Sequence, residues 1–273
     1  MYGEKHRKAY YEKQIDSLRE EVIGKHKKCG GTGFIEEIEA SDDTGFARRY
    51  VSECSCRKKF RTFSRLVLSN IKYSSLINQQ IYGKVVFDVV TKESLELRKN
   101  VVTPYIRKIK KAAKKPYGFL FLGKNGTGKT FVANKILYYA VLSGLTAHNI
   151  EMPELLLMGR KAFDKENQDI ERVLNEISVV DFLLIDEVGN ESKRSSYTIS
   201  EFKTLVKKRV SISKPTIIIS NYSYDSFKKA YGKSLDNMLR SHCKIFDFSK
   251  SVDVRGTKCS SEMNAFFKEI KRK

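Results

Sequence analysis

The sequence has no apolar run that approaches the roughly 18 residues a membrane-spanning helix requires. Its amino-terminal stretch, MYGEKHRKAYYEKQ, is charged and lacks the apolar core of a secretory signal peptide. It also has no internal repeat and no low-complexity tract. A hydrophobic content of 41% is ordinary for a globular protein. These features exclude a membrane protein and predict a cytoplasmic, globular one with no membrane partner.

Acidic residues are scarce relative to basic ones. The chain has 32 Asp and Glu against 52 Lys and Arg, which gives a formal net charge of +20. Such an imbalance favours a polyanionic partner, and nucleic acid is the first candidate. An excess of Lys also follows from the codon usage of an A/T-rich genome, so charge alone leaves both explanations open.

The length of 273 residues is enough for one full hydrophobic core and one smaller module. Residues 1–83 begin with a charged segment, up to about Lys28, whose apolar residues recur at helical spacing. Residues 84–273 alternate strand-like and helix-like segments, the pattern of a parallel sheet with helices on both faces. We therefore predict a small helical module over 1–83 and an α/β domain over 84–273. The expected strands are Phe119–Leu122, Thr146–Ile150, Val179–Ile185, Thr216–Ser220 and Lys244–Phe248, and a long helix is expected at Lys92–Lys115.

A glycine-rich run, GKNGTGKT, lies between an apolar strand-like stretch and a helix-like segment that begins at Phe131. Glycines free the backbone so that its N–H groups converge on phosphate oxygens. Lys129 can reach the β and γ phosphates, and the Thr130 hydroxyl can ligate Mg²⁺. A glycine-rich turn can match this pattern without function, but the flanking strand and helix satisfy the motif's structural context. The run predicts a nucleoside triphosphate site formed by Gly123, Lys124, Asn125, Gly126, Thr127, Gly128, Lys129 and Thr130.

A second motif, VVDFLLIDE, ends an apolar run with two adjacent carboxylates. A strand buried on both faces would present Asp186 and Glu187 at its carboxyl end, where open α/β sheets bind ligands. Asp186 is expected to hold Mg²⁺ through its water shell, and Glu187 to orient and deprotonate the attacking water. Adjacent acids can instead form a solvated turn, yet beside a phosphate loop hydrolysis is the better explanation. Asn221, after the strand TIIIS, is either a sensor of the γ phosphate or a common turn residue.

Three of the five cysteines cluster with a histidine. Two residues separate His26 from Cys29, and one separates Cys54 from Cys56. One imidazole and three thiolates suit a tetrahedral Zn²⁺, and glycines after the first pair supply the tight turn of a zinc knuckle. Reduced thiols without a metal are the alternative, and a disulfide is not expected in the cytoplasm. We interpret the remaining two cysteines as ordinary thiols, Cys243 and Cys259.

The order of GKNGTGKT, FLLIDE and TIIISNYS, after a cysteine module with HKKCGGTGF and CSCRKKF, resembles the DnaC/DnaI-type helicase loaders. These are AAA+ ATPases of the IstB/DnaC-like group. The resemblance covers nearly the whole chain, and the cysteine knuckle joined to the ATPase core is its most specific part. It implies an AAA+ domain that binds ATP and Mg²⁺, in which the Walker A, Walker B and sensor roles belong to Lys129, Thr130, Asp186, Glu187 and Asn221.

The resemblance also implies two functional arginines. Proteins of this type carry an arginine after the sensor that reaches the nucleotide of a neighbouring subunit. Its nearest match is Arg240 in MLRSHC, although the usual Ser-Arg-Leu order is altered. A closing arginine, matched by Arg255 in SVDVRG, would contact nucleotide within its own subunit. Either one could instead be a surface arginine. A shared site implies self-assembly into a ring or spiral.

The function implied is ATP-dependent loading of a hexameric replicative helicase onto single-stranded DNA at replication initiation, with residues 1–83 gripping the helicase. An IstB-like transposition ATPase shares the core but normally lacks a cysteine knuckle, and a nucleotide-bound, non-catalytic adaptor is a third alternative. A rival DNA site is the basic tail Arg107–Lys115, and both basic segments could be solvated faces. The expected DNA contacts lie on the helical segment Ser200–Val210, at Lys203, Lys207, Lys208 and Arg209.

Overall fold

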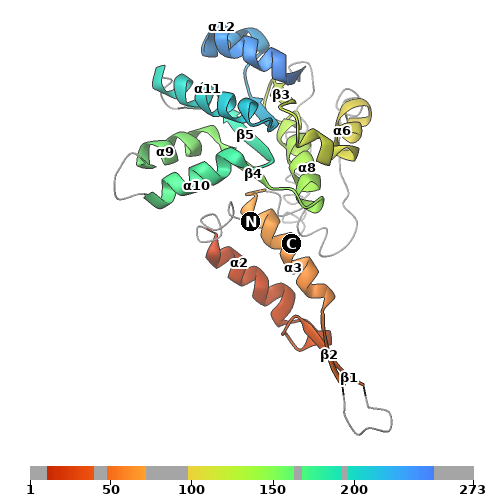
Figure 1. Ribbon diagram of the computed structural model, residues 1–273. Coiled ribbons are helices and arrows are strands. Elements are labelled where there is room, and N and C mark those ends of the chain that lie inside the picture. Colours follow the sequence, from red (N-terminus) through yellow and green to blue (C-terminus); the bar gives the residue numbers. More distant parts are fainter. Residues whose placement is uncertain (1–10, 40–47, 72–97, 163–167, 192–195, 249–273) are drawn as a thin grey trace, which may run out of the picture. The chain divides into compact units, whose positions relative to one another are not determined.

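The computed structural model divides into two compact units, Met1–Asn70 and Ile71–Lys273 (Figure 1). The structure describes residues 11–39, 48–71, 98–162, 168–191 and 196–248. The predicted boundary between 83 and 84 lies outside these ranges. None of the helices in the described part of the chain is both long and apolar enough to cross a membrane.

The amino-terminal unit consists of two helical segments joined by a hairpin. Helix α2 (Glu12–Arg19) continues into a π-helical turn, η2 (Glu20–Gly24), and a 3-10 turn, η3 (Lys27–Cys29), follows. Strands β1 (Phe34–Glu39) and β2 (Arg48–Glu53) pair antiparallel, and helix α3 (Ser55–Leu68) begins just after the hairpin. The predicted amino-terminal helix is therefore helical from Glu12 to Gly24 in its described part. Its buried residues are Leu18 and Ile23, which belong to the predicted apolar stripe.

The second unit is built on one parallel sheet of five strands, as predicted. The strands are β3 (Gly118–Leu122), β4 (Ala147–Glu151), β5 (Phe182–Val188), β6 (Thr216–Ser220) and β7 (Cys243–Asp247). Their order in the sheet is β4-β5-β6-β3-β7. Strand β6 therefore lies between β3, which precedes the glycine-rich run, and β5, which carries the acidic pair.

Side chains alternate between the two faces of this sheet. Leu120 and Ile218 pack into a core with helices α9 (Met152–Ala162), α10 (Gln168–Val179), α11 (Ser196–Ser211) and α12 (Tyr224–His242). Phe119 points the other way, where Tyr105 of helix α6 (Thr103–Arg107) meets it edge to face at 4.8 Å between ring centroids. Helices α7 (Ile109–Ala112) and α8 (Lys129–Leu142) lie on the side of α6 (Figure 1). Both faces are covered, which explains why the central strands are apolar at nearly every position.

Two predicted elements differ from the structure. The strand expected at Val179–Ile185 begins only at Phe182, because helix α10 extends to Val179, whose side chain is 45% exposed. The long helix expected at Lys92–Lys115 is not continuous. A π-helical turn, η4 (Arg98–Val102), leads into α6, and the backbone leaves helical geometry at Lys108 before α7 begins. Residues 92–97 of that prediction lie outside the described ranges.

Candidate nucleotide-binding site and metal-ligand cluster

The glycine-rich run forms a tight loop between β3 and α8. Gly123, Gly126 and Gly128 have φ values of 117°, 78° and 88°, a region that disfavours residues with a Cβ atom. The Lys129 amine lies under the loop and donates to the carbonyls of Gly123 and Lys124 at 2.6 and 2.5 Å. The loop thus curls around a buried ammonium group at the start of α8, where backbone N–H groups and the helix dipole favour an anion.

A pocket opens at this loop and collects most of the predicted nucleotide-site residues. It lies at the carboxyl ends of β5 and β6, as expected for an open parallel sheet. Because β6 lies between β3 and β5, Asn221 is brought between the loop and the acidic pair. Gly123 and Lys124 are not part of the lining, which consists of Asn125, Gly126, Thr127, Gly128, Lys129, Thr130, Asp186, Glu187, Ile219 and Asn221.

Asp186 is a buried carboxylate at the base of the pocket, with 8% of its surface exposed. Burial raises its pKa above the ordinary value, and the Glu151 carboxylate raises it further. Hydrogen bonds from the Glu187 N–H, at 2.7 Å, and from the Thr130 hydroxyl lower it, as does the charge of Lys129. A divalent cation beside Asp186 and Thr130 would favour the charged form of the carboxylate.

Glu151 is a site residue that the motifs did not predict. It ends β4, and its Cα pairs with that of Asp186 in the sheet register. Paired residues of neighbouring parallel strands point to the same face, so the two carboxylates are neighbours. The signal present in the sequence is an acid at the carboxyl end of a predicted strand.

Glu187 has an unusual backbone. Its φ is 57°, the left-handed region that residues other than Gly, Asn and Asp rarely adopt. Its carbonyl accepts a hydrogen bond from the Asn190 N–H at 3.0 Å, which closes a turn directly after the acidic pair. Backbone strain of this kind is concentrated at functional sites, where surrounding structure holds it in place.

The two predicted arginines are not in the pocket as described. Arg240 is exposed in the last turn of α12 and is absent from the pocket lining. It lies near the Tyr224 hydroxyl, which donates to the Asp236 carboxylate at 2.7 Å. Arg255 lies outside the described residues.

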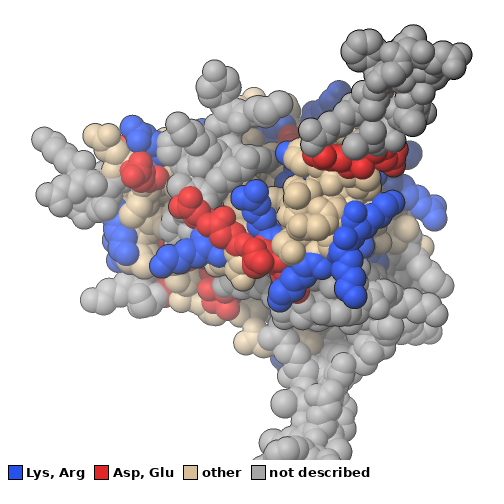
Figure 2. Space-filling view, turned by 90° about the horizontal axis from the view of Figure 1, so that it is seen from below, with Lys and Arg blue, Asp and Glu red and all other residues tan. Residues whose placement is uncertain are grey.

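The predicted DNA contacts separate into two groups. On α11, Lys207 and Lys208 are exposed and Lys203 is half-buried. The Lys208 amine is 3.5 Å from the side-chain oxygen of Asn175. On the face drawn in Figure 2, Lys and Arg side chains form several groups with Asp, Glu and uncharged side chains between them. The excess positive charge on that face is therefore not gathered into one continuous patch.

The prediction is wrong for Arg209, which is fully buried. Arg209 follows Phe202 and Val206 on the face of α11 that packs into the core, so helical periodicity turns it inward. Its guanidinium group joins the end of α11 to neighbouring segments, and burial lowers its pKa. It donates hydrogen bonds of 2.7–3.0 Å to the Thr216 hydroxyl and to the carbonyls of Ser178, Val180 and Pro215.

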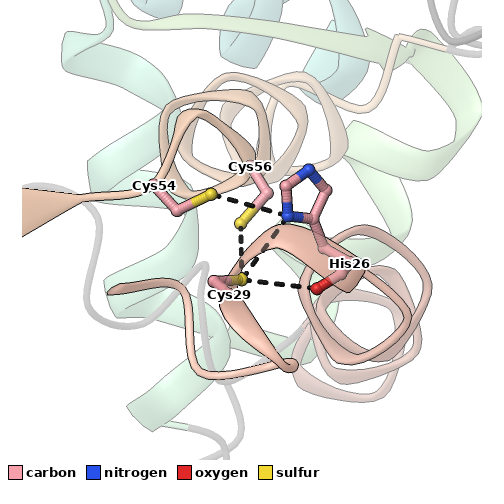
Figure 3. Close-up of side chains that lie close together, drawn as sticks. All are labelled: His26, Cys29, Cys54 and Cys56. Atoms are coloured by element: carbon pink, nitrogen blue, oxygen red, sulfur yellow. Dashed lines mark hydrogen bonds between the residues drawn. The ribbon is translucent and has the colours of Figure 1, made fainter. Parts of the chain in front are cut away.

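The four predicted metal ligands of the amino-terminal unit converge (Figure 3). Their ligand atoms all lie within 4.8 Å of one another. The His26 Nδ1 atom is 3.5 Å from the Sγ atoms of both Cys29 and Cys54, and the Cys29 and Cys56 Sγ atoms are 3.6 Å apart. A tetrahedral Zn²⁺ would separate its ligands by about 3.6 Å for sulfur and nitrogen and about 3.8 Å for two sulfurs, given its usual bond lengths. The donor set and its dimensions both fit this ion.

Local structure explains the convergence. His26 and Cys29 flank η3, and a left-handed Gly30 ends that turn, while Cys54 is the cap of α3 and Cys56 lies in its first turn. The Gly33 N–H donates to the Cys29 Sγ atom at 3.3 Å, an interaction that stabilises a thiolate.

A family model described as "IstB-like ATP binding protein" matches residues 112–253, slightly more than half of the chain. The replicative helicase loader DnaC of Buchnera aphidicola subsp. Baizongia pistaciae (strain Bp) is 32% identical over 123 residues, which are 45% of this chain and 50% of that protein. The replicative helicase loader DnaC of Escherichia coli (strain K12) is 31% identical over 124 residues, 45% of this chain and 49% of that protein. The chain thus spans about half the length of the curated relatives it matches.

A crystal structure of the DnaC helicase loader matches the second unit's fold. The TM-score is 0.52 at 17% sequence identity, and the match covers 59% of this chain and 93% of that chain. An identity this low establishes the fold alone. The predicted AAA+ architecture, a parallel sheet flanked by helices, is confirmed.

Proposed function

The chain belongs to the IstB-like ATP-binding protein family, and from this premise we propose that it is an ATPase that loads a hexameric replicative helicase onto single-stranded DNA. Support for the loader function comes from relatives named replicative helicase loaders, which match under half of the chain. The observation that carries the ATPase proposal is the pocket in which the phosphate loop, Asp186, Glu187 and Asn221 meet.

In this proposal, the loop and the first turn of α8 bind the triphosphate. Backbone N–H groups would contact phosphate oxygens, and Lys129 would exchange its contacts with the loop carbonyls for the β and γ phosphates. Glu187 would orient the attacking water and accept its proton. Asn221 would hydrogen-bond the γ phosphate or that water.

Asp186 and Thr130 would hold Mg²⁺, with Glu151 as an additional carboxylate close by. A buried carboxylate beside a hydroxyl suits a hard cation that keeps part of its water shell. When bound, Mg²⁺ would neutralise charge that develops on the transferred phosphoryl group. The residues present fit this ion, because the unfavourable burial of Asp186 is offset by a neighbouring positive charge.

Arginines complete the site in the proposed assembly. Arg240, exposed at the end of α12, would reach the nucleotide of the next subunit in a ring or spiral. Arg255 would contact nucleotide bound to its own subunit. The exposed lysines of α11, Lys203, Lys207 and Lys208, would contact the DNA backbone.

The amino-terminal unit would bind the helicase and hold one Zn²⁺ through His26, Cys29, Cys54 and Cys56. Zinc here would serve as a structural cross-link between the end of the first helical segment and the start of α3. We place the working boundary between the helicase-binding module and the AAA+ domain at residues 83 and 84. The family match lies within the ATPase core, which an IstB-like transposition ATPase shares, so the cluster in the first unit is what favours a loader.

Paired substitutions test the ATPase proposal. Lys129→Ala should abolish tight nucleotide binding, because it removes the charge that faces the β and γ phosphates. Glu187→Gln should bind ATP normally and lose about 100-fold or more in turnover, the range expected for a general base. Glu201→Gln, an exposed acid on α11, is the matched control and should hydrolyse ATP like wild type.

The assay is steady-state hydrolysis with and without single-stranded DNA, together with nucleotide titration. Wild-type turnover by Glu187→Gln would refute the water-activating role. A wild-type protein that binds ATP and never hydrolyses it would instead favour the non-catalytic adaptor. Co-purification with the host's replicative helicase, identified by mass spectrometry, separates the loader from the transposition ATPase.

A further inference from the structure

Tyr222 connects three segments around the nucleotide pocket but is not part of its lining. Its carbonyl accepts a hydrogen bond from the Gly123 N–H at 3.0 Å, where the phosphate loop begins. Its hydroxyl donates to the Gly189 carbonyl at 3.0 Å, two residues after Glu187. Its own N–H lies 3.3 Å from the Ser220 hydroxyl at the end of β6. One side chain thus ties the phosphate loop, the sensor strand and the loop after the acidic pair.

The ring of Tyr222 also fits closely against that last loop. Gly189 has a φ of 111°, and a Cβ atom built there would lie 2.8 Å from the Tyr222 Cε2 atom. Such a distance is far inside normal contact, so the loop can take this path only with glycine at 189. The left-handed backbone of Glu187 is part of the same turn and needs a neighbour that fixes it.

The far end of the loop is held by a second tyrosine. The Glu191 carboxylate accepts from the Gly189 N–H at 3.1 Å and from the Tyr231 hydroxyl of α12 at 2.6 Å. Gly189 is therefore gripped through both its N–H and its carbonyl, by Glu191 on one side and by Tyr222 on the other. The loop after Glu187 has little freedom to move while both contacts persist.

We propose that Tyr222 is a positioning residue for ATP hydrolysis, holding the Gly189 turn so that the Glu187 carboxylate is aimed at the attacking water. This inference rests on the ATPase function proposed above. Because Tyr222 does not touch the pocket, its loss should change the hydrolytic step and leave nucleotide affinity alone. A residue that only supported the fold would have no selective effect on that step.

Tyr222→Phe removes the hydroxyl and keeps the ring. We expect kcat to fall about three- to tenfold, the effect of one lost hydrogen bond on a catalytic geometry, with unchanged ATP affinity. Tyr105→Phe is the matched control, because the Tyr105 hydroxyl also donates to a backbone carbonyl, that of Tyr117, at 2.8 Å. The control should keep wild-type kcat.

Combining substitutions locates the effect. In single-turnover assays on the Glu187→Gln background, Tyr222→Phe should cause no further loss, because the carboxylate it positions is already gone. Gly189→Ala, which forces a Cβ atom into the ring, should lower kcat more than Tyr222→Phe does, and it tests the same contact should the phenylalanine variant fail to fold.

Three outcomes would overturn the proposal. A wild-type kcat for Tyr222→Phe or Gly189→Ala would show that the contact does not position Glu187. An equal loss on the Glu187→Gln background would assign the effect to another group. Absence of wild-type turnover would refute the ATPase function itself, and this result is distinct because it precedes any comparison of variants.

Discussion

Removing the proposed zinc should unfold the amino-terminal unit and leave the α/β unit folded. The perturbation is Cys56→Ser, which deletes one of three thiolates from a cluster whose ligand atoms lie within 4.8 Å of one another. Cys56 is 1% exposed, and the cluster joins the end of the first helical segment to the start of α3. Without the ion, only the hairpin and a small apolar core hold these parts together.

The magnitude follows from the size of this unit, Met1–Asn70. A single core in a domain this small supplies about 3–5 kcal/mol. Binding of Zn²⁺ to a structural site contributes on the order of 10 kcal/mol or more to folding. The ion therefore contributes more than the entire core, so its loss should take the unit below the threshold for folding. Its buried apolar side chains, among the described residues, are Tyr11, Leu18, Ile23, Phe63, Leu66, Leu68 and those of the cluster.

Elemental analysis should find one zinc per chain in the wild type and close to none in Cys56→Ser. Limited proteolysis should then cut the variant within its first seventy or so residues, while the second unit resists and still binds ATP. Cys243→Ser, which changes a cysteine outside the cluster, is the control and should retain the metal. Wild-type protein purified without chelators and free of zinc would refute the prediction, as would a Cys56→Ser variant with full metal content.

Local patterns were sufficient to predict the strands and the nucleotide pocket. Strands covered on both faces are apolar at nearly every position, and phosphate loops need glycine where φ is positive, so both are visible in the sequence. The same rule misplaced one boundary. The apolar run that leads into β5 begins at Val179, but that residue still ends α10, and period alone does not separate a buried helix end from a strand.

Features that depend on strand order or distant contacts could not be predicted. The sheet register alone places Glu151 beside Asp186, from strands whose separation in sequence says nothing of their pairing. Tyr222 and Gly189 likewise meet only because β6 lies between β3 and β5. Arg209 is a different case, since its inward position follows from the spacing of Phe202 and Val206, and counting charges without that periodicity produced the error.

The remaining predictions concern the interfaces of the assembled protein. Arg240→Ala should bind ATP normally but lose about 10³-fold in hydrolysis if the arginine acts on a neighbour's nucleotide, and mixing it with Lys129→Ala protein should restore some activity; failure of both outcomes would transfer the role to Arg255. Charge reversal of Lys207 and Lys208 should weaken single-stranded DNA binding without changing ATP affinity. Because each phosphate contact contributes about 0.7 to the salt dependence of binding to single strands, losing two should reduce that slope by about 1.4. The matched control reverses two exposed lysines of the rival segment, Lys110 and Lys111. Measured by fluorescence anisotropy across a salt series, an effect confined to the control pair would rule out α11 as the DNA-binding helix.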